Sequence, residues 1–300
     1  MALIWDIETD KSMEVDEFFA HLEDNIVLGD IDSLAACAEP LRALANNRTF
    51  VLDAYHKELK EFWAGSRVNA HLAQSIQIGR SKQFYVRVNI WLPIAKGVRT
   101  EAFQKRLYSY DLPHDHNFSF LTVGYFGGGY TTDIYEYDHG QCIGFVDEVA
   151  NCSFLGRYQL HPGRVMLYRQ GKDIHVQYSP EEVSVSVNLM GRDLDLGWDQ
   201  QYILDVKNDR LIGGAGDLVS NRLYVIEAAG YFGDEETIGL LHDLAIGYTC
   251  DKTKARAIQS LDTLSPAEGE RAREKASARV RELADLPIIT GNYARSYSGA

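Results

Sequence analysis

The spacing of apolar residues predicts a helical N-terminal part, a strand-rich middle and a helical C-terminal part. Residues 13–64 follow the 3.6-residue period of helices. The clearest helix begins after a candidate N-cap at Thr49 and ends before Gly65. Its apolar stripe has i, i+3, i+7 and i+10 spacing and consists of Leu52, Tyr55, Leu59 and Phe62. Pro40 interrupts the pattern over 33–47, which predicts one short helix or a broken one.

From about residue 83 the pattern changes to short runs rich in Val, Ile, Tyr and Phe, separated by Gly, Asp and Asn. Such runs are typical of antiparallel β-structure. VSVSVNL alternates strictly, which predicts one face in a core and the other in a polar interior or solvent. The expected strands are FYVRVNIWL, FLTVGYF, DIYEYD, CIGFVD, VMLYR, IHVQY and VSVSVNLM.

After residue 230 the helical period returns. The segment SPAEGERAREKASARVRELADLP predicts a single helix with Ser265 as N-cap, Pro266 at the first helical position and Glu268 completing a capping box. Pro287 lies beyond its end. Its arginines and glutamates are expected on a solvated face.

Length and composition indicate a globular protein with a substantial core, since 45% of its 300 residues are hydrophobic. The predicted fold class is mainly β with α: a β-barrel flanked by N- and C-terminal helices. We expect a helical extension over residues 1–82, the barrel over 83–200, and a mainly helical extension packed on the barrel over 201–300.

The charge balance argues against two classes of partner. Asp and Glu total 43 against 30 Lys and Arg, a net charge of −13, which repels nucleic-acid backbones and anionic membrane surfaces. No apolar run approaches the roughly 18 residues of a membrane span. The four cysteines show no CxxC spacing, and the N-terminus lacks the features of a signal peptide. We therefore expect a cytoplasmic protein with free thiols.

Three histidines form the strongest chemical motif. His114 and His116 head the segment PHDHNFSFLTVGYFGGGY, and on a strand their spacing of two places both side chains on one face. A metal site needs a further ligand from elsewhere. Downstream, LHPGRVMLYRQGKDIHVQY contains a Pro-Gly turn, a strand, a second turn at Gly171, and His175 at the start of the next strand.

These motifs together resemble the two conserved motifs of the cupin superfamily over roughly residues 83–190, about a third of the chain. The resemblance implies a double-stranded β-helix barrel that binds a metal through His114, His116 and His175. Cupins usually carry a Glu four or five residues after the second histidine, where this chain has Phe120 and Leu121. The resulting three-histidine set resembles the thiol dioxygenases, which implies Fe(II) with O2 as co-substrate. Ligand type alone also permits other divalent first-row metals.

The same resemblance suggests how substrate binds. Tyr85-x-Arg87 precedes His114 by 27 residues, much as a Tyr-x-Arg segment precedes the HxH of thiol dioxygenases, where the arginine binds the substrate carboxylate. A guanidinium offers carboxylates a planar fork and stays charged when partly buried. Arg87 is therefore a candidate catalytic and substrate-binding residue. Arg169, on the strand before His175, is a second candidate anion partner.

Three further residues are candidates at the site. Tyr125 is a candidate substrate contact and Tyr178 a candidate catalytic hydrogen-bond donor. Glu136 is a candidate fourth ligand, or an acceptor that orients an imidazole. His139 and His161 lie in turn-like segments, where exposure is expected rather than ligation.

The sequence therefore predicts a metal-dependent, dioxygenase-like oxidoreductase acting on a small carboxylate-bearing molecule such as an amino acid or thiol derivative. The resemblance also suggests a homodimer. A 2-oxoglutarate-dependent hydroxylase is one alternative, but these enzymes carry a carboxylate where this chain has His116. A cupin that binds a small molecule without catalysis is the other alternative.

Overall fold

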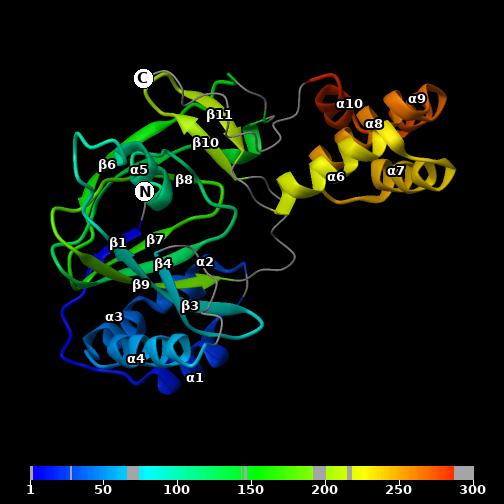
Figure 1. The fold of residues 1–300 in the computed structure, drawn as a ribbon. Coiled ribbons are helices and arrows are strands. Elements are labelled where there is room, and N and C mark those ends of the chain that lie inside the picture. Colours follow the sequence, from blue (N-terminus) through cyan, green and yellow to red (C-terminus); the bar gives the residue numbers. More distant parts are fainter. Residues whose placement is uncertain are drawn as a thin grey trace. The chain divides into compact units, whose positions relative to one another are not determined.

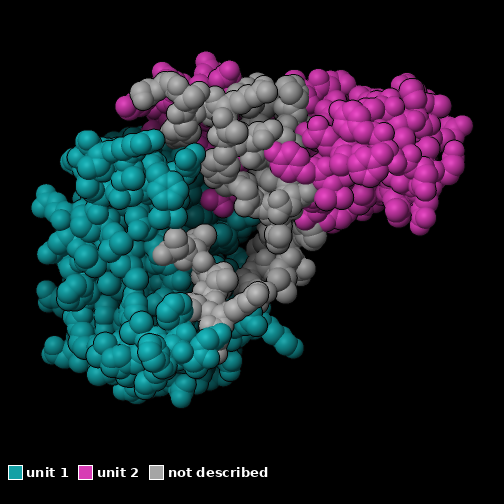
Figure 2. Space-filling view, in the orientation of Figure 1, with its two compact units in different colours: residues 1–137, 153–196 teal, residues 138–152, 197–300 magenta. Residues whose placement is uncertain are grey.

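The structure is a computed structural model that describes residues 3–27, 29–65, 74–142, 144, 147–191, 201–214 and 218–286. The chain forms two compact units, which Figure 2 colours separately. The first contains residues 1–137 and 153–196, and the second contains residues 138–152 and 197–300. The N-terminal helices and the strands that carry the three histidines therefore belong to one unit.

The larger sheet of the first unit has six antiparallel strands in the order β1-β7-β4-β9-β3-β2. Its two faces differ in chemistry, because successive side chains of a strand point to opposite faces. On β9, Val187 and Leu189 join the core on the outer face, whereas Ser186 and Asn188 point to the inner face. The strands are β1 (Leu3–Asp6), β2 (Ser75–Arg80), β3 (Phe84–Trp91), β4 (Phe120–Phe126), β7 (Arg164–Tyr168) and β9 (Ser184–Gly191).

Four helices cover the outer face of this sheet (Figure 1). Phe18 and Leu44 from the helices are fully buried with strand residues such as Leu121. Pro40 lies in the first turn of the third helix, where its missing N–H costs little, so the pattern over 33–47 is a broken helix. The helices are α1 (Val15–Asn25), α2 (Ile31–Ala36), α3 (Ala38–Asn46) and α4 (Phe50–Trp63).

Helix α4 differs from its prediction in the face that it buries. Phe50 and Val51 at its start are buried against the sheet. Leu52, Leu59 and Phe62 of the predicted apolar stripe are instead 53%, 63% and 68% exposed. The helix packs on this core through its first turn and through Tyr55, which is partly buried, so the predicted stripe identified one of the packed positions and missed the others.

The smaller sheet of the first unit has three antiparallel strands in the order β6-β5-β8. It faces the larger sheet through a second core, in which Ile134 of β5 packs with Phe120, Met166, Tyr168 and Met190 of the larger sheet. The strands are β5 (Thr131–Glu136), β6 (Ser153–Gln159) and β8 (Asp173–Gln177), and the short helix α5 (Glu101–Tyr108) belongs to the same unit. The first unit is therefore two facing antiparallel sheets with helices outside the larger one.

Six of the seven predicted strand runs correspond to β3, β4, β5, β7, β8 and β9. The seventh, CIGFVD, includes residues 143, 145 and 146, which lie outside the described residues. The sequence did not predict β1, β2, β6 or the two strands of the second unit. These strands are shorter or more exposed than the predicted ones, and along β6 buried and exposed side chains do not alternate clearly.

The second unit combines a two-stranded sheet with a helical layer. The predicted single helix from Ser265 is wrong: the chain breaks at Ala276, and Ser277 caps a new helix by accepting a hydrogen bond from the N–H of Val280. Among the described residues, no helix is long and apolar enough to cross a membrane. The elements are η1 (His139–Gln141), β10 (Tyr202–Asp205), β11 (Arg210–Gly214), α6 (Leu218–Phe232), α7 (Glu235–Gly247), α8 (Asp251–Leu264), α9 (Pro266–Lys275) and α10 (Ala278–Ala284).

The connection between β4 and β5 depends on glycine. Gly129 has φ of +80°, and a Cβ atom there would lie 2.0 Å from the carbonyl oxygen of Leu160. The backbone at Leu160 is itself held by a hydrogen bond to Tyr130. At neighbouring Gly128, a Cβ would meet side-chain atoms instead of main chain: Oε1 of Glu182 at 3.3 Å and Nε2 of Gln159 at 4.0 Å.

We predict that Gly129→Ala lowers the free energy of unfolding by more than about 2 kcal/mol, because it adds left-handed backbone strain to a collision with main chain. Gly128→Ala is the matched control, with an expected change below about 1 kcal/mol. Urea unfolding followed by circular dichroism measures both. Equal effects would show that this turn does not depend on its backbone contact.

Candidate metal centre

The three histidines come from two neighbouring segments. His175 lies on β8, and His114 and His116 lie in the extended segment before β4, not within a regular strand as predicted. His114 and His175 pair directly through two backbone hydrogen bonds of 3.2 and 3.0 Å. The N–H of Gly171 donates to the carbonyl of His116 at 2.9 Å. The turn before β8 therefore fixes the second histidine while β8 fixes the first.

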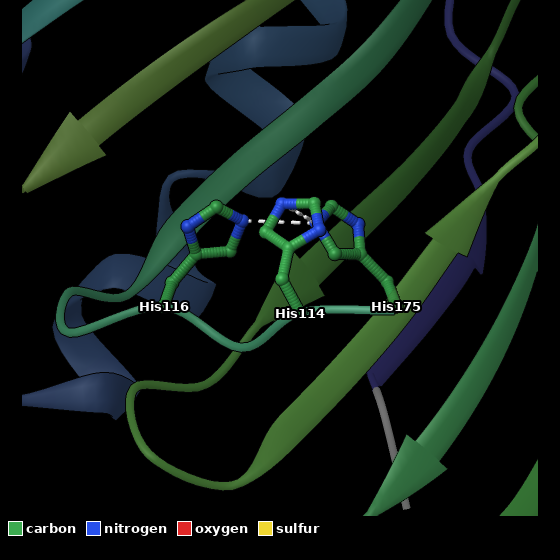
Figure 3. Close-up of side chains that lie close together, drawn as sticks. All are labelled: His114, His116 and His175. Carbon is green, nitrogen blue, oxygen red and sulfur yellow. Dashed lines mark hydrogen bonds between the residues drawn. The ribbon is translucent and has the colours of Figure 1, made fainter. Parts of the chain in front are cut away.

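This backbone arrangement brings the three imidazoles together (Figure 3). The Nε2 atom of His175 lies 2.9 Å from Nε2 of His116 and 3.0 Å from Nε2 of His114. His114 and His175 are 8% and 1% exposed, while His116 keeps intermediate exposure. These three are the metal-capable group found among the described residues, and it contains no carboxylate.

The convergence of three ring nitrogens fits a bound cation. Each Nε2 carries either one hydrogen or one lone pair, so Nε2 of His175 cannot satisfy both neighbours by hydrogen bonding. A divalent ion accepts a lone pair from every ring. Two nitrogens about 2.1 Å from one ion, at right angles, are about 3.0 Å apart, which agrees with the observed separations.

The protonation states also favour metal binding. Burial lowers the pKa of His114, and it lowers the pKa values of His116 and His175 well below the usual range; at these two, a proton on a neighbouring ring would add to the effect, as the charge of Arg87 does at His116. The rings are therefore neutral at physiological pH, as metal ligands must be. Nδ1 of His114 lies 2.9 Å from the carbonyl oxygen of Leu112, and donation there leaves the lone pair on Nε2.

Aromatic rings line one side of the centre. Phe120 stacks on Tyr168 at 4.7 Å, and their rings lie 4.9 Å from His116 and 4.7 Å from His175 respectively. Phe120 thus occupies the position where a carboxylate ligand was considered, and it contributes an apolar surface instead.

Two residues that support the centre were not identified from the sequence. Asp115, between the two histidines, is fully buried and accepts a 2.5 Å hydrogen bond from the hydroxyl of Tyr137. Its position inside the HxH motif was the available signal. This contact anchors the residue between the two histidines through a buried side chain.

Arg87 points into the space between the sheets. It is inward on β3, and its charge acts on His116 and on buried Tyr130. Desolvation lowers the pKa of Arg87, yet the side chain keeps intermediate exposure. Among the described residues no acidic side chain pairs with it, and its Nε has no hydrogen-bond partner. A buried cation without an anion is costly, so this position favours an anionic ligand.

Arg169 and Glu136 neutralise each other instead of serving the centre. The Nη2 atom of Arg169 lies 2.6 Å from Glu136 and 2.5 Å from fully buried Asp173. Glu136 is not part of the metal-capable group. The structure thus places Arg169 in a protein ion pair where substrate binding was expected, and it places Glu136 away from ligation.

Tyr125 and Tyr178 lie on the wrong faces for the roles predicted for them. Tyr125 packs against Phe50 in the helical core and donates a hydrogen bond to the carbonyl of Asn47. Tyr178 follows His175 by three positions, an odd spacing that reverses the face. Its hydroxyl donates to Asp133 at 2.7 Å. Both hydroxyls are thus hydrogen-bonded to groups outside the three-histidine cluster.

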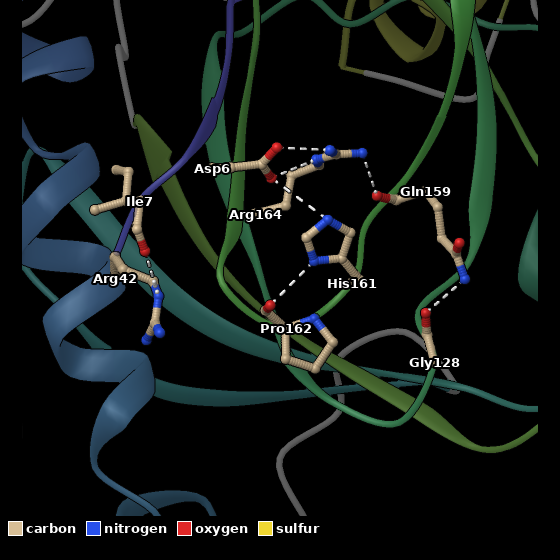
Figure 4. A network of polar contacts seen from close by, with 8 residues as sticks. All are labelled: Asp6, Ile7, Arg42, Gly128, Gln159, His161, Pro162 and Arg164. Atoms are coloured by element: carbon tan, nitrogen blue, oxygen red, sulfur yellow. Dashed lines mark hydrogen bonds and ion pairs between the residues drawn. The ribbon is translucent and has the colours of Figure 1, made fainter. Parts of the chain in front are cut away.

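His161 and His139 lie outside the centre, as expected. His161 is 41% exposed and contacts Asp6 at 3.4 Å, beside the Asp6–Arg164 ion pair (Figure 4). His139 belongs to the second unit, where its ring stacks on Tyr202. His161 therefore supplies a matched control for the buried histidines.

No protein-family model and no curated protein matches this sequence. Similar solved structures include hydroquinone 1,2-dioxygenase from Sphingomonas sp. TTNP3, with 10% identity and a TM-score of 0.29 over 41% of this chain and 68% of that one. Salicylate 1,2-dioxygenase from Pseudaminobacter salicylatoxidans has 9% identity and a TM-score of 0.27 over 47% and 32%. The DMSP lyase DddQ from Ruegeria pomeroyi DSS-3 has 15% identity and a TM-score of 0.23 over 44% and 55%. These TM-scores establish neither family nor activity.

We predict that His114→Ala and His175→Ala each lower bound metal from near one ion per chain to below about a tenth, since two imidazoles bind a first-row ion far more weakly than three. His161→Ala should keep the wild-type content. Elemental analysis of anaerobically purified, folded protein measures this. Full metal content in either buried-histidine variant would place the ion elsewhere.

Proposed function

We propose that the first unit is a cupin-type barrel and that the protein is a mononuclear, non-haem metal-dependent oxygenase. The metal is iron(II), O2 is the co-substrate, and the substrate is a small carboxylate-bearing molecule such as an amino acid or thiol derivative. The observation that carries the proposal is the convergence of the neutral rings of His114, His116 and His175. Iron is chosen on the resemblance to three-histidine thiol dioxygenases.

An iron(II) ion held by three imidazoles supplies coordination positions and electrons for oxygen chemistry when bound. The chain's own residues supply the remainder. Backbone pairing of His114 with His175 fixes two rings, and Phe120 and Tyr168 keep an apolar surface beside them. An apolar wall limits water near the ligand nitrogens and strengthens electrostatic interactions there.

Arg87 is the proposed substrate anchor. Its uncompensated guanidinium faces the same interior as His116, so a carboxylate bound there would hold the rest of a small substrate toward the three histidines. This geometry relieves the desolvation cost of Arg87 and gives the substrate one orientation. Arg169 offers no such opportunity, because Asp173 and Glu136 already neutralise it.

The proposal is tested by oxygen consumption. Anaerobically purified protein is loaded with iron(II) and supplied with a panel of thiol carboxylates and amino acids, and O2 uptake is followed with an electrode. Uptake that needs both iron and a carboxylate substrate supports it. Uptake that requires 2-oxoglutarate and yields succinate would identify a hydroxylase instead. Stoichiometric metal without uptake on any compound would indicate a binding protein.

For a substrate found in that panel, we predict that Arg87→Gln lowers kcat/KM at least a hundredfold, mostly through KM, because a charge-assisted bidentate contact is lost. Arg169→Gln is the matched control for loss of an arginine and should leave KM unchanged. The two variants are compared only if circular dichroism shows that both are folded. Steady-state O2 uptake measures both. An unchanged KM in Arg87→Gln would remove Arg87 from substrate binding.

A further inference from the structure

A chain of buried hydrogen bonds ends at Asn188. The indole N–H of Trp91 donates to the hydroxyl oxygen of Ser186 at 3.0 Å, and that hydroxyl donates to Oδ1 of Asn188 at 3.4 Å. Trp91, Ser186 and Asn188 are 3%, 1% and 3% exposed. The side-chain bonds connect β3 with β9, which are adjacent in the larger sheet.

This chain fixes which end of the amide is free. Trp91 can only donate, so Ser186 accepts from it and has one proton left to give. The proton goes to Oδ1 of Asn188, which leaves the NH2 group as the other end of the amide. The Nδ2 atom is buried and has no hydrogen-bond partner. An unused buried donor of this kind calls for a ligand.

The free amide lies on the same rung as the uncompensated arginine. Asn188 is directly opposite Arg87 on one side and Thr122 on the other, and directly opposite side chains share one face of a sheet. Nε of Arg87 also has no hydrogen-bond partner. One rung across β3, β9 and β4 therefore presents two unused donor groups and a hydroxyl to the interior.

We propose that Asn188 is a second substrate-binding donor, which with Arg87 forms a two-point site for a carboxylate, and that Ser186 and Trp91 are its positioning residues. This inference rests on the proposed function, which places the substrate beside Arg87. It adds roles for Asn188, Ser186 and Trp91, to which the proposed function gives none. Arg87 supplies the charge, and the oriented amide selects a planar oxyanion over an isosteric neutral group.

The test uses full-length protein loaded with zinc, which is redox-inert and separates binding from turnover. Calorimetry gives the affinities for benzoate and for benzamide, a pair of similar shape that differs in charge. Wild type should prefer benzoate. Asn188→Leu should lower benzoate affinity at least tenfold, the size expected for a hydrogen bond to a charged group. Asn188→Asp keeps the acceptor for Ser186 but loses the donor, and it should lose more benzoate affinity than Asn188→Leu, because its charge also compensates Arg87 and repels the ligand.

Controls separate positioning from simple loss of structure. Ser186→Ala frees the amide to rotate and should reduce the benzoate preference about threefold to tenfold, whereas Ser186→Thr keeps the hydroxyl and should restore it. Asn25→Leu on α1 makes a matched replacement outside the interior and should change neither affinity. Zinc content and circular dichroism confirm that each variant is folded.

Two results would overturn the inference: a wild-type protein that does not prefer benzoate, or folded Asn188→Leu and Asn188→Asp variants that keep the wild-type preference. These outcomes are distinguishable from failure of the oxygenase proposal. A benzoate preference that the Asn188 variants lose, in a protein without any O2 uptake, would refute the oxygenase and retain the donor site. Iron-dependent O2 uptake together with an unchanged benzoate preference in both Asn188 variants would support the oxygenase and refute the donor site.

Discussion

The backbone pairing of His114 with His175 is the contact on which the candidate centre depends. Two hydrogen bonds join residues 61 positions apart and place their side chains on one face. The adjoining turn then fixes His116 through Gly171. Main-chain hydrogen bonds of the paired segments thus set where the three rings start, and the rings converge from those positions.

Alternation along the strands of the larger sheet gives the first unit one apolar face that stabilises the fold and one polar face that is turned to the interior. Outward residues such as Val187 and Leu189 stabilise the fold by packing under α1–α4. Inward residues of the larger sheet, such as Asn188 and Arg87, have buried polar atoms without hydrogen-bond partners, and this lowers the stability of the fold. The large helix-covered core offsets that cost. The helices therefore contribute to function indirectly, because they stabilise a sheet whose inner face is polar.

The sequence predicted the central strands and the grouping of the three histidines because both rest on local patterns: period-two alternation, HxH spacing, and turns marked by glycine and proline. It misplaced residues wherever a face depended on partners distant in sequence. Tyr125 and Tyr178 were candidates for contacts with the substrate, but Tyr125 packs against Phe50 and Tyr178 donates a hydrogen bond to Asp133. The break at Ser277 required knowing that its hydroxyl caps a new helix. The Trp91–Ser186 bond links residues 95 apart and had no local signal.

Charge balance connects the two halves of the proposed site. Three neutral histidines would leave a bound divalent ion with its full charge, and Arg87 adds another cation without an acidic partner among the described residues. A carboxylate ligand would have compensated the ion, but Phe120 and Leu121 stand in its place. Taking up an anion would bring the interior closer to neutrality. Under the proposed function that anion is the substrate, so its binding completes the electrostatics of the site. A neutral analogue of the same shape would leave both cations uncompensated and would bind poorly.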